Sequence, residues 1–156
     1  MTQVEGAEIC GRQSAILSGL ESMEETRFVN QSSTSLMILI DPQEQTGWVI
    51  LLSGQRKSTC RRHTGAKTWN VSLECVGVES THIFSGFIFN DLTLNFITGY
   101  DWNKGEPNDK STDQACIVMM IPAGKGDVKH GKLDDINCTT SGKFKSRGVL
   151  CGKEAK

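Results

Sequence analysis

The residues best suited to chemistry lie in two short oxygen-rich segments. Residues 106–109 have the sequence Glu-Pro-Asn-Asp, and residues 134–137 have the sequence Asp-Asp-Ile-Asn. Calcium takes about six to eight hard oxygen ligands from carboxylates, amide carbonyls and water. Glu106 and Asn108 flank a proline and can point at one ion. A cis bond before Pro107 would fix that geometry, because X-Pro is the common cis peptide. The segment at Asp134 and Asp135 can complete the coordination.

Charge alone leaves a second interpretation of these segments open, a solvated acidic loop. Other calcium and catalytic patterns fail. Residues 101–105 begin like the calcium loop of a helix-loop-helix motif, but its sixth position is Glu106 instead of Gly and its twelfth is Thr112 instead of Glu. The sequence contains neither a phosphate-binding Gly-x-x-x-x-Gly-Lys-Ser/Thr motif nor a Gly-x-Ser-x-Gly nucleophile motif. The histidines are isolated and are expected at the surface: His63, His82 and His130. We therefore expect no enzyme.

Size and charge exclude several classes of protein. The chain has 156 residues, of which 37% are hydrophobic, and its 17 basic and 18 acidic residues give a net charge of -1. One domain with a real core fits this length. Because the net charge is close to zero, the sequence lacks the excess of basic residues expected of a protein that binds nucleic acid or an anionic membrane. The apolar runs, of which residues 116–121 are typical, fall far short of the roughly 20 residues that cross a bilayer. We expect a soluble globular domain.

The cysteines indicate an oxidising compartment. Six are present, far apart, and none forms a Cys-x-x-Cys pair, which disfavours a zinc ribbon. Their even number suggests three disulfides, and parity alone leaves the pairing open. Asn-x-Ser/Thr sequons agree weakly with secretion as a glycoprotein: Asn30, Asn70 and Asn137. The first residues are too polar for a signal peptide, so we expect Met1 to begin a fragment if the protein is extracellular.

The order of elements predicts an α+β fold. We expect the end of a helix over residues 3–10 and a second helix after Ser22, which forms a capping box with Glu25. Strands are expected at residues 48–52, 84–89 and 116–121, with a last apolar stretch at 148–151. Two helices followed by short strands give no βαβ rhythm. Trp48 and Trp102 are expected to anchor the core, whereas Trp69 is a candidate ligand or partner contact.

One segment differs from the rest. Residues 55–80 are rich in basic side chains, and Cys60 and Cys75 bracket most of them. We interpret this segment as a surface insertion closed by its own disulfide, with solvated basic charges.

The motifs together resemble the C-type lectin domain. The resemblance rests on residues 102–109, 113–116, 133–138 and 149–151, and upstream on residues 7–10, 15–17, 21–29 and 48–51. It follows the chain in order and leaves out only residues 55–80. It implies a single C-type lectin-like domain over residues 1–156, with two helices, short antiparallel strands and a long loop region. The sequence departs from the family in lacking the N-terminal strand that precedes the first helix, and this absence would leave a sheet edge exposed.

The resemblance implies pairings and ligands. The two core disulfides of the family would be Cys10-Cys151 and Cys116-Cys138, which leaves Cys60-Cys75 within the insertion. The calcium ligands would be Glu106, Asn108, Gln114, Asp134 and Asp135. The first four would also bind the sugar, whereas Asp135 would bind only the ion. In this family a Glu-Pro-Asn site binds mannose, fucose or N-acetylglucosamine.

The sequence departs from the family pattern at three ligand positions. Gln114 stands where the family has an acid, and Asp134 where it has an amide, so this acid–amide pair is exchanged. The adjacent acid Asp113 is an alternative to Gln114 as the ligand. Some members of the family bind an additional calcium ion at an auxiliary site, and Ser53 stands where that site has an acid. Asp109 by itself is not enough to hold an ion, so we expect one calcium ion.

The leading hypothesis is an extracellular lectin that acts in innate immunity and binds glycans through calcium. Clustering of several domains would provide avidity. The alternative is a C-type lectin-like domain that binds a protein partner without calcium. The exchanged pair and the basic insertion favour this alternative.

Overall fold

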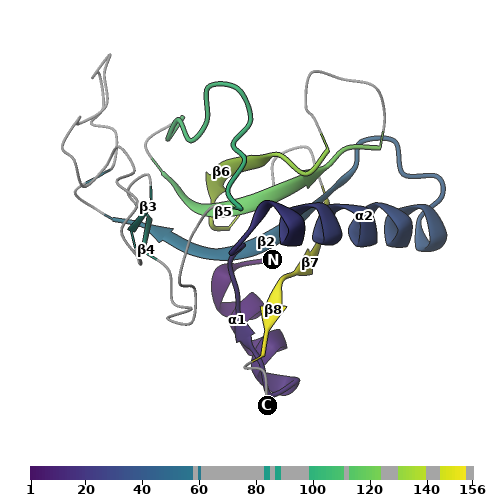
Figure 1. The fold of residues 1–156 in the computed structure, drawn as a ribbon, viewed down its shortest axis with the longest axis horizontal. Coiled ribbons are helices and arrows are strands. Elements are labelled where there is room, and N and C mark those ends of the chain that lie inside the picture. The colour runs from purple at the N-terminus through teal and green to yellow at the C-terminus, as the bar shows by residue number, and fades with distance from the viewer. Residues whose placement is uncertain are drawn as a thin grey trace.

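The computed structural model describes residues 1–57, 60, 83–84, 87–88, 99–110, 113–123, 130–139 and 145–153. Along the chain, helices α1 (Gln3–Arg12) and α2 (Met23–Ile40) come before most of the strands (Figure 1). The strands are β1 (Ile16–Leu17), β2 (Trp48–Arg56), β3 (Ile83–Phe84), β4 (Phe87–Ile88), β5 (Gln114–Ile121), β6 (Leu133–Asn137), β7 (Lys145–Val149) and β8 (Cys151–Gly152). The α+β class is as the sequence predicts.

Side chains cap both helices at their N-termini. Thr2 and Glu5 form a complete capping box at α1, with reciprocal bonds of 3.2 and 2.7 Å. At α2, Ser22 accepts from the Glu25 amide at 3.1 Å, but the Glu25 carboxylate accepts from the Glu21 amide instead of the Ser22 amide. The capping box predicted at Ser22 is therefore only half formed. The α1 helix covers the whole of residues 3–12, where only a helix end was expected.

One six-stranded sheet forms the centre of the molecule. Its order is β3-β4-β2-β5-β6, and β7 also pairs with β2. The β2–β7 pair is parallel, so the sheet is mixed, and the expectation of antiparallel strands holds only for its other pairs. Because β2 pairs with β5 along one edge and with β7 and β4 along the other, β2 is the strand around which the sheet is built.

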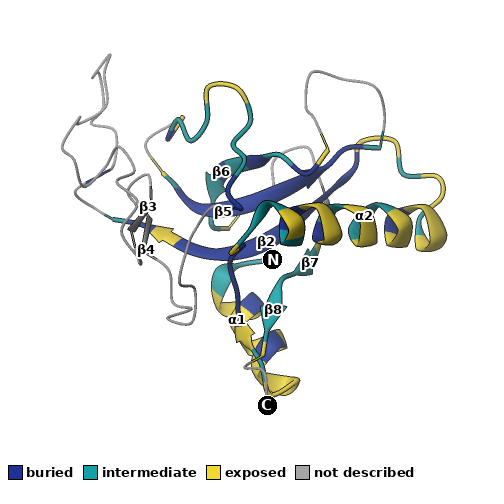
Figure 2. Ribbon diagram, in the orientation of Figure 1, coloured by how far each residue is buried: buried dark blue, intermediate teal, exposed yellow. Residues whose placement is uncertain are grey.

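The two faces of the sheet carry separate apolar clusters, because successive side chains of a strand point to opposite faces. Trp48, Ile50 and Leu52 of β2 lie in one cluster, together with Val29 and Met37 of α2. Val49 and Leu51 lie in the other cluster, with Cys116 and Val118 of β5. Figure 2 shows the resulting pattern, with β2 and β5 buried and the outer side of α2 exposed.

Helix α1 lies on the second face of the sheet. Gly6 makes this close approach possible, since a Cβ there would lie 2.9 Å from Leu51 Cδ2 and 3.1 Å from Val149 Cγ1. Trp48 is 2% exposed and belongs to the core as predicted. Trp102 is only partly buried and packs against the edge of the first cluster, beside Tyr100.

Two disulfides tie the ends of elements together. Cys10 of α1 is bonded to Cys151 of β8, and Cys116 of β5 is bonded to Cys138, just after β6. These are the two core pairings that the resemblance implied. Cys60 is buried and disulfide-bonded, while Cys75 lies outside the described residues, as does most of the 55–80 insertion, including Trp69 and Asn70.

The strands at residues 83–88, at β1 and β8, and at the end of β2 differ in detail from those expected. Residues 84–89 were expected to form one strand, but the structure has two short ones, with Ile83 opposite Ile88 and Phe84 opposite Phe87. Met1 and Thr2, which precede α1, are not part of a strand, and β8 pairs with β1, with Leu17 opposite Cys151. The insertion was taken to begin at residue 55, yet β2 continues through Arg56.

None of the described helices is long and apolar enough to span a membrane. His130 is exposed as expected, and the other two histidines lie outside the described residues.

Removing the Cys10–Cys151 bridge should destabilise the fold more than removing the Cys116–Cys138 bridge. Their sequence separations are 141 and 22 residues, so loop entropy predicts losses of about 5 and about 3 kcal/mol when each pair is replaced by alanine. Urea unfolding of the two double variants measures this difference. Equal losses would show that loop closure does not determine the contribution of either bridge.

Candidate functional site

The loop of residues 101–109 is fastened to the start of β6 by backbone hydrogen bonds. The Asn103 amide donates to the Leu133 carbonyl at 2.9 Å, and the Leu133 amide donates to the Asp101 carbonyl at 3.0 Å. These bonds bring the two oxygen-rich segments of the sequence side by side. The loop then turns at Gly105, whose φ of +87° favours glycine. The Glu106–Pro107 bond that follows is cis.

Three carboxylates converge where these segments meet. One oxygen from each of Glu106, Asp134 and Asp135 lies within 4.8 Å of the others. Asp135 is fully buried, whereas Glu106 and Asp134 are partly exposed. Among the residues that the structure describes, this is the one group of three or more acidic, histidine or cysteine side chains close enough to share an ion.

Asp135 is held from three sides. Its Oδ1 accepts from the Asn108 amide at 2.8 Å, and its Oδ2 accepts from the Asp109 amide at 2.7 Å. Oδ2 also accepts from Arg56 Nη2, and both side chains of this ion pair are 0% exposed. A carboxylate oxygen can accept about two hydrogen bonds, so Oδ1 still has capacity for another ligand. Besides being a candidate ion ligand, Asp135 therefore anchors the loop through these backbone amides.

Gln114 reaches the same place from the start of β5. Its Nε2 donates to the Asp135 carbonyl at 2.5 Å, which turns its Oε1 the other way. Gln114 Oε1 and Glu106 Oε2 are both buried without a hydrogen-bond partner in the described part of the chain. Buried oxygens of this kind need a donor or a cation. Asn108 Oδ1 accepts from the Lys110 amide at 2.7 Å and, like Asp135 Oδ1, can take a further ligand.

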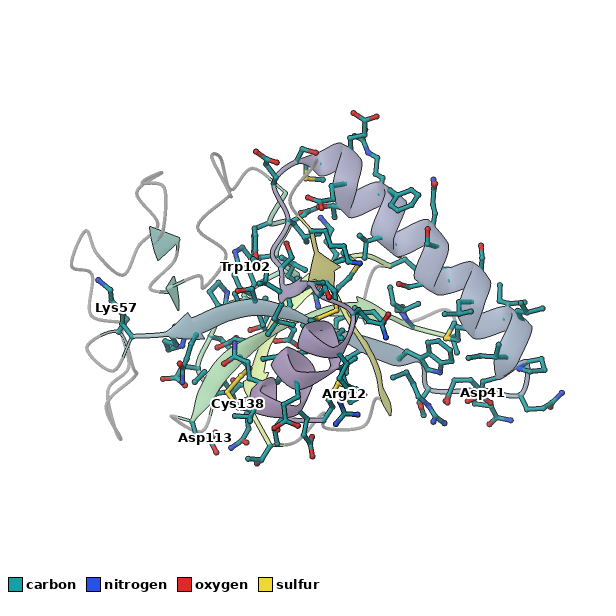
Figure 3. The ribbon with its side chains drawn as sticks, turned by 90° about the horizontal axis from the view of Figure 1, so that it is seen from below. Arg12, Asp41, Lys57, Trp102, Asp113 and Cys138 are labelled. Atoms are coloured by element: carbon teal, nitrogen blue, oxygen red, sulfur yellow. A yellow bond between two sulfur atoms is a disulfide. The ribbon has the colours of Figure 1, made fainter. Side chains whose placement is uncertain are left out.

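Asp113 does not share this arrangement. It projects outward at the start of β5, near Cys138 (Figure 3), and its carboxylate accepts from Asn137 Nδ2 at 2.6 Å. Asp113 is exposed, so its negative charge is solvated. Of these two neighbours, Gln114 and not Asp113 lies against Asp135. The Asn137 amide of the third sequon is occupied by this contact.

Sequence reasoning missed two residues of the site, Arg56 and Asp109. Arg56 was placed within a surface insertion with solvated charges, yet it is 3% exposed and its Nε donates to the Gln114 carbonyl at 2.9 Å. Asp109 is 0% exposed, and its Oδ1 accepts from the Gln114 amide at 2.9 Å. A bulge in β2 between Leu52 and Gln55 interrupts the strand alternation, so the pattern of residues 48–52 could not be extended to place Arg56.

The electrostatics of the cluster reflect its crowded negative charge. Burial, followed by the charges of Asp134 and Asp135, raises the pKa of Glu106 to about 8. Burial, followed by the charge of Asp135, raises the pKa of Asp134 to about 6. A cation between these carboxylates would favour their charged forms and lower both pKa values. The carboxylate and amide oxygens of this cluster are the hard donors that calcium prefers. Ser53, which stands at the position of the family's auxiliary calcium ligand, is buried.

We expect Glu106 to make the calcium-free protein less stable as the pH rises from about 5 to about 8. The ordinary pKa of Glu106 is 4.5 and its folded value is about 8. In this window the unfolded chain therefore binds fewer protons than the folded chain, and the free energy of unfolding falls with pH. Urea unfolding in EDTA at several pH values measures this slope. Glu106→Gln, which does not titrate, should flatten it, and an unchanged slope would contradict the assignment.

Comparison with known proteins agrees with this architecture. A family model described as "C-type lectin domain-containing protein 141/158" matches residues 1–154. Among solved structures, the chain is similar to the mouse scavenger receptor C-type lectin carbohydrate-recognition domain, with 11% identity and a TM-score of 0.49, covering 88% of this chain and 74% of the other. The structural likeness is too distant to carry an argument about ligands. The family match covers nearly the whole sequence, and the chain belongs to the C-type lectin domain-containing protein 141/158 family.

Proposed function

We propose that residues 1–156 act as a single extracellular domain that binds carbohydrate through one calcium ion. The observation that carries this proposal is the convergence of the Glu106, Asp134 and Asp135 carboxylates within 4.8 Å of one another. Burial and neighbouring charge raise the pKa values of Glu106 and Asp134, and a divalent cation would favour the charged forms of both groups. The proposal makes the protein a lectin and not an enzyme.

The donors present fit calcium. Glu106, Asp134 and Asp135 supply carboxylate oxygens, and Asn108 and Gln114 supply amide oxygens. The unpartnered, buried Glu106 Oε2 and Gln114 Oε1 support this set, because each lacks a hydrogen-bond donor that would otherwise satisfy it in the described part of the chain. When bound, calcium would act as a Lewis acid toward two neighbouring sugar hydroxyls. The remaining coordination would come from those hydroxyls or from water.

The side chains around the ion would orient the sugar. Glu106 and Asn108 form one acid–amide pair, and Asp134 and Gln114 form the exchanged pair. In each pair the acid accepts a hydrogen bond from a hydroxyl and the amide donates one. Gln114 Nε2 uses one hydrogen for the Asp135 carbonyl and keeps the other for a ligand. The proposed ligands are glycans with terminal mannose, fucose or N-acetylglucosamine, with avidity from several clustered domains.

The domain should be retained on mannose resin in calcium and released by EDTA. Replacing Glu106 or Asp134 with the matching amide removes one ligand charge. We expect each variant to weaken calcium affinity by roughly tenfold or more, because affinity follows the charge of the ligands. Calcium titration by calorimetry and retention on the resin measure the two effects.

Asp113→Asn is the matched control, because it also converts an acid near the site to its amide. The Asp113 side chain is exposed and is hydrogen-bonded to Asn137, outside the carboxylate cluster. This variant should bind calcium and resin like the wild type, within about twofold. Loss of binding in Asp113→Asn with none in Glu106→Gln would overturn the assignment. So would a folded wild type that no monosaccharide resin retains.

The buried Arg56–Asp135 pair favours a second candidate function, protein recognition without calcium. Arg56 already supplies one positive charge to the acids. A domain of this kind should give no heat on addition of calcium and no change in melting temperature. Calorimetry on the wild type therefore separates the two functions in one measurement.

A further inference from the structure

Arg56 is the only lysine or arginine that is buried in the described part of the chain. It comes from the end of β2, whereas the carboxylate that it contacts comes from β6, two strands away in the sheet order. A buried ion of either sign is costly unless it is paired and hydrogen-bonded. The position of Arg56 therefore needs a physical reason.

Arg56 belongs to a network that joins four segments. Its Nη2 donates to Asp135 of β6, and its Nε donates to the Gln114 carbonyl at the start of β5. The Gln114 amide donates to Asp109, and the Asp109 amide donates back to Asp135. The Asn108 amide completes the attachment of the loop to Asp135. The Asn108 and Asp109 amides attach residues 108–109 to β6, and the bonds of Arg56 and Gln114 hold Asp135 and Asp109 in place.

We infer that Arg56 is a built-in counter-cation, a positioning residue that keeps residues 106–109 docked on β6 whether or not calcium is present. Asp135 thus has a partner for its charge in the ion-free protein. Glu106 and Asp134, which are partly exposed, form no such ion pair with the lysines and arginines of the described residues. Calcium would join a loop that is already in place.

Arg56 also sets the charge that an ion meets. When Glu106, Asp134 and Asp135 are all ionised, these three converging carboxylates and the one guanidinium carry a formal net charge of minus two, which equals the charge that one divalent ion neutralises. This part of the inference rests on the proposed function. The docking of the loop by Arg56 does not, because it follows from the hydrogen bonds alone.

The test compares melting temperatures of the wild type and Arg56→Gln in EDTA and in calcium. In EDTA the variant should melt about 10 °C or more below the wild type, because it leaves a buried carboxylate unpaired. Calcium should then stabilise the variant by more degrees than it stabilises the wild type, because the ion takes over the missing positive charge. An increment equal to or smaller than that of the wild type would overturn the charge-sharing part of the inference.

Two controls separate charge from packing. Arg56→Lys keeps the charge but cannot reach both acceptors as the planar guanidinium does, so its melting temperature should fall while its calcium increment stays near that of the wild type. Arg147→Gln breaks a more exposed pair with Asp41 at 3.5 Å and should change neither value appreciably. A calcium increment in Arg56→Lys as large as in Arg56→Gln would contradict a role for the charge.

Hydrogen exchange on the wild type decides the docking even if Arg56→Gln fails to fold. The amides of Asn108 and Asp109 should exchange at least tenfold more slowly in EDTA than in an unstructured chain, on the order expected for hydrogen-bonded groups. Unprotected amides in EDTA would overturn the inference. A wild type with protected amides but no thermal response to calcium would instead contradict the proposed calcium site and leave the docking role of Arg56 supported.

Discussion

The carboxylate of Asp135 and the guanidinium of Arg56 form a buried ion pair on which the arrangement of the site depends. Neither group tolerates burial alone, and each belongs to a different strand of the sheet. Asp135 then accepts the two backbone amides that fix the loop of residues 106–109. The position of the loop is thus determined by a charge pair in the sheet as well as by its own turn residues.

The site consequently has an inner and an outer layer. The inner layer, made of Arg56, Asp109 and Asp135, is buried and its carboxylates are hydrogen-bonded. The outer layer, Glu106 and Asp134, is partly exposed, and burial, together with the charge of neighbouring carboxylates that include Asp135, raises the pKa values of both groups. The inner layer gives the site its geometry, and in the proposed function the outer layer would supply charge to a bound cation. This division explains how crowded acids can be present in a stable fold.

The sheet supports this arrangement through its length and order. Strand β2 carries apolar residues on both faces before it ends in Arg56, so the guanidinium lies beyond the core and beside β5. Helix α2 covers one face through Val29 and Met37. Helix α1 approaches the other face at Gly6, and its Cys10 is bonded to β8. The packing on both faces holds β5 and β6, and with them Gln114 and Asp135, in a fixed register.

The sequence alone was sufficient for the class of fold, most of the elements and the candidate ligands. Apolar runs and turn residues placed β2 and β5, because their periodicity is a local property. The motif at residues 106–109 and the acids at 134 and 135 identified the candidate site, because calcium chemistry requires those side chains. Only the tertiary structure decided that Arg56 is a buried partner of Asp135, that Gln114 rather than Asp113 lies against it, and that residues 83–88 contain two strands. These outcomes depend on a bulge, a side-chain direction and a pairing across the sheet, and all three are set by contacts between residues far apart in the chain.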